Sequence, residues 1–147
     1  MNIQDAKEKL DVLNHFIESL SSLTTEYCIL VEGRKDMLSL KALGISSKVL
    51  SLKSWKGSLI SKLEEIEEPN LIVLTDLDEE GEYLASLIYR FLNGSKHVIL
   101  EYRNMLKKRF KGELKGIEEL PKLQSRLCRI LKNVHCGSAL TPDLTEP

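Results

Sequence analysis

Two short stretches of the chain place acidic residues directly after runs of apolar residues. Glu32 follows the apolar run 28–31, and Asp76 and Asp78 follow the apolar run 71–74. Such runs are typical of strands buried on both faces of a parallel sheet, and ligands bind where these strands end. If the two strands are neighbours, the three carboxylates meet at one edge. Crowded carboxylates repel one another unless a cation lies among them, and oxygen ligands suit Mg²⁺.

The spacing around these acids favours the same interpretation. Asp76 and Asp78 are two residues apart, so their side chains point to the same side of an extended segment. Gly33 and Gly81 permit tight turns from strand to helix and let a phosphate approach the backbone. The alternative is structural, because Asp and Glu commonly cap helices or occupy their first turn. The same layout after two different strands favours a metal site.

The two stretches resemble the motifs of the TOPRIM domain, which occurs in type IA topoisomerases, DnaG-type primases, OLD-family nucleases and 5S rRNA maturases. That domain carries a glutamate after its first strand, which Glu32 matches, and often an acid just after it, which Asp36 matches. It carries Asp-x-Asp after its third strand, and Asp76 and Asp78 match this motif. The resemblance covers residues 27–102 and is strongest to small stand-alone TOPRIM proteins of archaeal type.

The resemblance implies roles for these residues. Glu32, Asp76 and Asp78 are expected to be both the catalytic residues and the ligands of Mg²⁺, or of Mn²⁺ in its place. Asp76 and Asp78 would hold the ion, while Glu32 would act as general acid or base or share a metal. The residues expected to position these ligands without binding the ion directly are Asp36, Gly33 and Gly81.

The alternation of strands and helices predicts a doubly wound sheet with right-handed crossovers. The resemblance implies a three-layer α/β/α TOPRIM fold, which is Rossmann-like, with a mainly parallel four-stranded sheet and additional helices at both ends. Apolar residues at helical spacing predict a helix over residues 3–21, and a strand is expected over 97–102. The pattern does not determine the order of the strands. The expected organisation is an N-terminal helix over 1–24, a TOPRIM domain over 25–102, a basic C-terminal helical extension over 103–140 and a disordered tail over 141–147.

Charge is distributed unevenly along the chain. Residues 1–100 carry 11 Lys and Arg against 16 Asp and Glu, a balance of −5, whereas residues 101–147 carry 10 against 6, a balance of +4. A basic segment beside an acidic metal site suits a polyanionic substrate, although a solvated helix face is an equally good explanation. The residues expected to contact nucleic acid are Lys35, Lys53, Lys56, Lys107, Lys108, Arg109 and Lys111.

These observations favour a Mg²⁺-dependent protein that acts on phosphodiester bonds of nucleic acid, as a small nuclease or an RNA-processing factor, with RNA favoured over DNA. The alternative is a non-catalytic RNA-binding or assembly subunit that retains the acidic site. Glu79 stands where topoisomerases usually carry a basic residue, and a topoisomerase or primase needs further regions that 147 residues do not hold. Without a signal peptide or an apolar run of membrane length, we expect a cytoplasmic protein with no membrane partner. The oligomeric state is not predicted.

Overall fold

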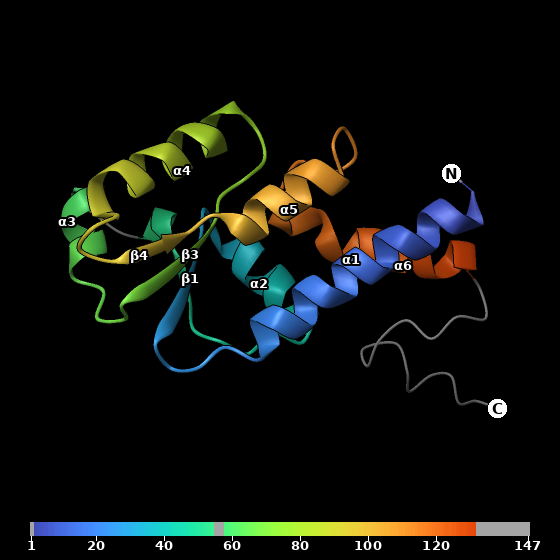
Figure 1. Ribbon diagram of the computed structural model, residues 1–147, viewed down its shortest axis with the longest axis horizontal. Coiled ribbons are helices and arrows are strands. Elements are labelled where there is room, and N and C mark those ends of the chain that lie inside the picture. Colours follow the sequence, from blue (N-terminus) through green and yellow to red (C-terminus); the bar gives the residue numbers. More distant parts are fainter. Residues whose placement is uncertain (1, 55–57, 132–147) are drawn as a thin grey trace.

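The computed structural model describes residues 2–54 and 58–131, and this part of the chain is built around a four-stranded sheet (Figure 1). The strand order is β2-β1-β3-β4, and every neighbouring pair is parallel. In the central pair Val31 lies opposite Leu74, so β1 and β3 end at the same level. The neighbouring strands that the sequence interpretation required are therefore present. The strands are β1 (Tyr27–Val31), β2 (Val49–Ser51), β3 (Asn70–Leu74) and β4 (His97–Ile99).

Helices cover both faces of the sheet, because the side chains of each strand alternate between two apolar cores. Cys28, Leu30 and Val73 pack with α3 (Leu59–Glu64) and α4 (Glu79–Leu92). The alternate residues Ile29, Val31, Ile72 and Leu74 pack with the remaining helices, and this arrangement confirms the predicted three-layer α/β/α fold. These helices are α1 (Ile3–Ser21), α2 (Arg34–Ala42), α5 (Glu101–Arg109) and α6 (Leu120–Leu131), with short 3₁₀ turns η1 (Leu52–Ser54) and η2 (Ile117–Glu119).

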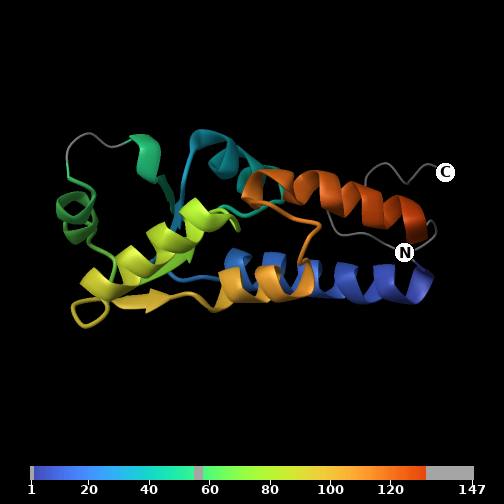
Figure 2. The same cartoon turned by 90° about the horizontal axis from the view of Figure 1, so that it is seen from above.

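Helices α1, α5 and α6 extend beyond the sheet and form one end of the elongated molecule (Figures 1 and 2). Helix α1 spans the predicted residues, and Asn2 caps it by accepting a hydrogen bond from the Asp5 amide at 2.7 Å. Its Leu13, Phe16 and Leu20 side chains are fully buried, and burial of each such side chain contributes about 1.5–3 kcal/mol. None of the helices in the described ranges is long and apolar enough to cross a membrane.

The chain leaves the sheet earlier than the sequence predicts. Strand β4 ends at Ile99, whereas a strand over 97–102 was expected, and α5 follows almost at once. The reason is visible in the helical spacing of Tyr102, Leu106 and Phe110, which all pack into the core shared with α1. The predicted extension begins inside this helix. Its last residues and the predicted tail lie outside the described residues, and the division into domains stays a prediction.

Candidate metal centre

Glu32 and Asp76 meet at the carboxyl edge of the two central strands. Each lies just beyond its strand, and Oε2 of Glu32 accepts a hydrogen bond from the Asp76 backbone N–H at 2.8 Å. Glu32 is only 3% exposed, and this burial raises the pKa of its carboxyl group. The hydrogen bond from Asp76 opposes the rise in pKa, whereas the charges of Asp78 and Glu80 add to it.

The Asp76 carboxylate is the most strongly perturbed acid at this edge. Burial raises its pKa, and repulsion from Glu32, Asp36 and Asp78 raises it further, to about 7, against a smaller opposing effect of Lys53. Within the described residues, no hydrogen-bond donor and no cation contacts this carboxylate directly. A partly buried carboxylate that faces like charges and lacks a donor is suited to a bound cation.

Asp78 and Asp36 also have structural uses. Asp78 is exposed and caps α4, where its Oδ1 accepts a hydrogen bond from the Gly81 N–H at 2.8 Å. Asp36 is buried, and its Oδ2 accepts from the Gly33 N–H at 3.0 Å. Burial raises the pKa of Asp36. Both residues therefore cap or stabilise the start of a helix, as the structural alternative predicts, and the backbone of Glu118 provides a further hydrogen bond to Asp36.

The donor set fits Mg²⁺ with few protein ligands. In the part of the chain that the structure describes, no three Asp, Glu, His or Cys side chains gather as a set of direct ligands. Mg²⁺ commonly takes only one or two carboxylates and completes its octahedral shell with waters and substrate phosphates. Asp76 and Asp78 would hold such an ion, with Glu32 beside them.

Two glycines close around Asp76. A Cβ on Gly81 would lie 1.8 Å from the Asp76 carbonyl oxygen, and a Cβ on Gly116 would lie 2.3 Å from Asp76 Oδ1. Helix α4 and the segment before η2 therefore approach Asp76 more closely than any other residue type would allow. The sequence pointed to Gly81 but missed Gly116, which lies forty positions along the chain from Asp76. By contrast, Gly33 is extended (φ −139°), and a Cβ there would meet only atoms 3.9 Å away.

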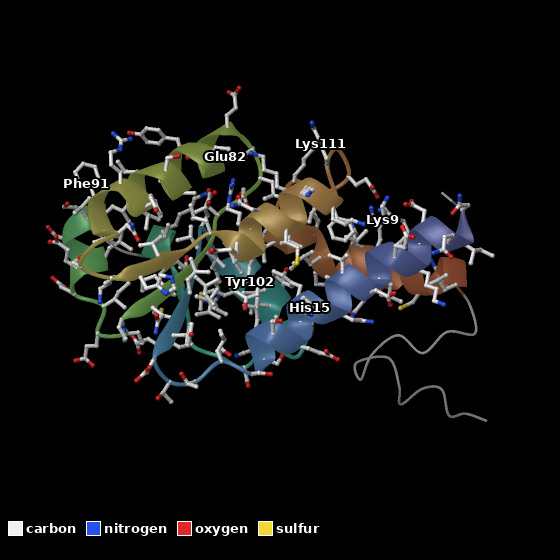
Figure 3. The ribbon with its side chains drawn as sticks, viewed as in Figure 1. Lys9, His15, Glu82, Phe91, Tyr102 and Lys111 are labelled. Atoms are coloured by element: carbon white, nitrogen blue, oxygen red, sulfur yellow. The ribbon has the colours of Figure 1, made fainter. Side chains whose placement is uncertain are left out.

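Arg103 is a second residue of the site that was not predicted from the sequence. Its side chain is 2% exposed, and its Nε donates to the Thr75 carbonyl at 3.1 Å while an Nη donates to the Asp76 carbonyl. Nη1 pairs with Glu82 at 3.0 Å, and Figure 3 shows Glu82 between α4 and α5. The peptide of Asp76 is thus held by Glu32 at its N–H and by Arg103 at its C=O. The spacing of Arg103 with Leu106 and Phe110 places it on the inner face of α5.

Of the basic residues predicted to contact nucleic acid, Lys53 is the one described residue that lies among the acids. Its backbone N–H donates to the Glu32 carbonyl at 3.0 Å, and its charge lowers the pKa of Glu32, Asp36 and Asp76. Lys53 is exposed and so is able to meet a phosphate at this edge. Lys35 is exposed in the first turn of α2, and Lys56 lies outside the described residues.

The predicted basic stretch on α5 is divided by ion pairs. Lys107 pairs with Glu82 at 2.6 Å, and Arg109 pairs with Glu8 at 3.1 Å. Lys108 and Lys111 are exposed without an ion pair to any described residue, and Lys111 points into solvent beyond the end of α5 (Figure 3). Two of the four cations are therefore partly neutralised by acids of the protein itself.

Comparisons with known proteins agree with this fold. Residues 29–109 match a family model described as Toprim-like. A protein named UPF0292 protein from Thermococcus sibiricus is 37% identical over 93 residues, covering 63% of this chain and 73% of that protein. A second UPF0292 protein, from Thermococcus onnurineus, is 32% identical over 120 residues, covering 81% and 83%.

A solved structure of a protein from Aquifex aeolicus superposes with a TM-score of 0.60 at 29% identity, covering 72% of this chain and 95% of that one. The family match spans more than half of the chain and includes both acidic motifs. The chain therefore belongs to the Toprim-like family, a class of metal-binding domains with functions related to nucleic acids.

Proposed function

We propose that this protein is a Mg²⁺-dependent enzyme that hydrolyses phosphodiester bonds of nucleic acid, with RNA as the favoured substrate and Mn²⁺ as an alternative ion. The observation that carries the proposal is the state of Asp76. Its partly buried carboxylate has a pKa of about 7 because of burial and neighbouring acids, and no described residue donates a hydrogen bond to it or forms an ion pair with it. A divalent cation held by Asp76 and Asp78 would remove this repulsion.

Residues of the chain itself have the remaining chemical roles, which are proton transfer and compensation of the substrate's charge. An ion held by Asp76 and Asp78 would polarise a phosphoryl oxygen and would lower the pKa of a bound water. Glu32 uses Oε2 to accept the Asp76 N–H, which leaves Oε1 to take up a proton from an attacking water. Burial raises the pKa of Glu32, which makes its carboxylate a stronger base. Lys53, exposed beside these acids, offsets the charge of the substrate phosphate.

A second function has an observation of its own in its favour. Glu32, Asp36 and Asp78 each accept a backbone hydrogen bond, so these acids also stabilise the turns between strands and helices. A non-catalytic RNA-binding or assembly subunit would retain them for that reason alone. In such a protein the acids hold the fold, and the nucleic acid is bound without cleavage.

Cleavage assays on two matched variants separate these functions. Labelled RNA and DNA are incubated with the purified protein in Mg²⁺, Mn²⁺ or EDTA. We expect metal-dependent cleavage that falls at least a hundredfold in Asp76→Asn and persists in Asp11→Asn, an exposed acid on α1 that serves as the control. Undiminished cleavage in Asp76→Asn contradicts the proposed enzyme. Binding without any cleavage assigns the protein to the second function.

A further inference from the structure

A cavity of about 750 Å³ lies along the outer face of α2. The helix contributes Arg34, Met37, Leu38 and Lys41, whose spacing of three, four and seven residues places them in one stripe. Apolar side chains of Ile45 and Val49 line it as well. We call this cavity, defined by these six residues, the α2 groove.

The opposite face of α2 is committed to the fold. Asp36, Ser39 and Leu40 are buried, and Ser39 Oγ donates to the Glu118 carbonyl at 3.1 Å. Three of the four residues of the stripe are not used in this way, because Leu38 is 51% exposed and Arg34 and Lys41 are exposed, whereas Met37 is partly buried and packs against the core. The helix therefore presents a second face that the described part of the fold leaves open.

The α2 groove has the charge pattern of a site for an anionic ligand with an apolar body. Arg34 and Lys41 form no ion pair with any described residue, and none of the residues that line the groove is acidic. The two cations are seven residues apart, which is about 10 Å along a helix, and Met37 and Leu38 lie between them. A single-stranded nucleic acid offers this alternation, with phosphates at intervals and bases between them.

The position of the groove connects it to the acidic residues. Arg34 follows Gly33 and Glu32 directly, so one end of the groove begins where β1 ends. The cavity also has a volume suited to a nucleotide-sized ligand.

We infer that the α2 groove binds a single-stranded segment of nucleic acid next to the phosphodiester bond at the acidic residues. Arg34 and Lys41 contact phosphates, and one base lies against Met37 and Leu38. This inference rests on the proposed function for its substrate. Phosphate and apolar contacts carry little sequence information, so binding is tolerant of sequence.

The test is a binding measurement that does not depend on cleavage. A fluorescent single-stranded RNA of twelve nucleotides, and the same sequence as DNA, are titrated in EDTA over a series of salt concentrations. The variant Arg34→Ala/Lys41→Ala is compared with Lys7→Ala/Lys122→Ala, which removes the same charge from exposed positions on α1 and α6. Melting temperatures verify that both variants fold.

We expect the groove variant to bind RNA at least tenfold more weakly, and its plot of log affinity against log salt to lose about 1.4 in slope, for two phosphates of a single strand. The control variant should bind like the wild type. Equal affinity of the two variants, or no binding by the wild type, overturns the inference. Preference for the DNA probe identifies which single strand the groove takes, while the inference stands.

A third variant distinguishes nucleic acid from a protein partner. Leu38→Asp should weaken RNA binding while the molecular mass in solution stays constant. A change of oligomeric state with RNA affinity intact makes the groove an interface between copies of the chain and overturns the inference. Cleavage in Mg²⁺ is scored separately. Groove-dependent binding without any cleavage refutes the proposed enzyme alone, whereas cleavage and binding that ignore the groove refute this inference alone.

Discussion

At the scale of single residues, Asp76 is the centre of the site because its backbone is fixed while its carboxylate is left without a partner among the described residues. Glu32 and Arg103 bind the backbone N–H and C=O of Asp76, and Gly81 and Gly116 pack so closely against it that neither position has space for a Cβ. Under the proposed function, this fixed backbone would position the Asp76 carboxylate for an ion before the ion binds.

The buried guanidinium of Arg103 gives the first prediction at this scale. Arg103→Met removes the donor for two backbone carbonyls and leaves Glu82 without its buried partner. The free energy of unfolding, measured in urea, should therefore be about 2–4 kcal/mol lower than in the wild type. Lys107→Met breaks an exposed ion pair to the same Glu82 and should lower the free energy of unfolding by less than about 1 kcal/mol. Equal losses in the two variants would show that Arg103 is an ordinary surface cation.

At the scale of elements, the site depends on how closely α4 and the segment before η2 approach β3. The Leu77 N–H donates to the Lys115 carbonyl at 2.8 Å, and Thr75 Oγ1 donates to the Gly81 carbonyl at 2.8 Å. These contacts hold both segments against the end of the strand. The segment before η2, which belongs to the helical end of the molecule, therefore forms one side of the acidic site.

Glycine substitutions test this close approach. Gly81→Ala places a methyl group against the Asp76 backbone and should lower the unfolding free energy by at least about 2 kcal/mol. Gly33→Ala, in the other motif, makes only van der Waals contacts at 3.9 Å in an extended conformation and should change the unfolding free energy by less than about 1 kcal/mol. Chemical denaturation of the two variants measures the difference. A tolerant Gly81 and a sensitive Gly33 would reverse the account of which turn needs glycine.

At the scale of the whole molecule, the sequence predicts the layers of the fold better than the contacts between distant segments. Apolar runs and helical spacing are local, so the three-layer architecture and the extent of α1 follow from them. The acids after β1 and β3 were likewise readable, because parallel strands end at one edge. The roles of Arg103 and Gly116 could not be predicted from the sequence, since their contacts with Asp76 form only when the C-terminal segments fold back onto the sheet. The same folding back explains why α5 begins before the predicted end of β4.

The charge of Asp76 opposes folding in the absence of metal, and under the proposed function a divalent cation would compensate it. Its folded pKa of about 7 lies above its ordinary value of 3.8, so the folded state binds more protons between these values and loses stability as the pH rises through them. Burial raises the pKa of Glu32 and Asp36 as well, which adds a contribution of the same sign.

The most direct measurement is the free energy of unfolding in urea at pH 5 and pH 8, with EDTA and with Mg²⁺, for the wild type, Asp76→Asn and Asp11→Asn. In EDTA, the unfolding free energy of the wild type and of Asp11→Asn should fall by about 1 kcal/mol or more between pH 5 and pH 8. At pH 8, Mg²⁺ should restore this lost stability. Asp76→Asn should show a smaller pH dependence and little response to Mg²⁺. If Asp76→Asn responds to pH and to Mg²⁺ as the wild type does, Asp76 is not the residue that holds the ion.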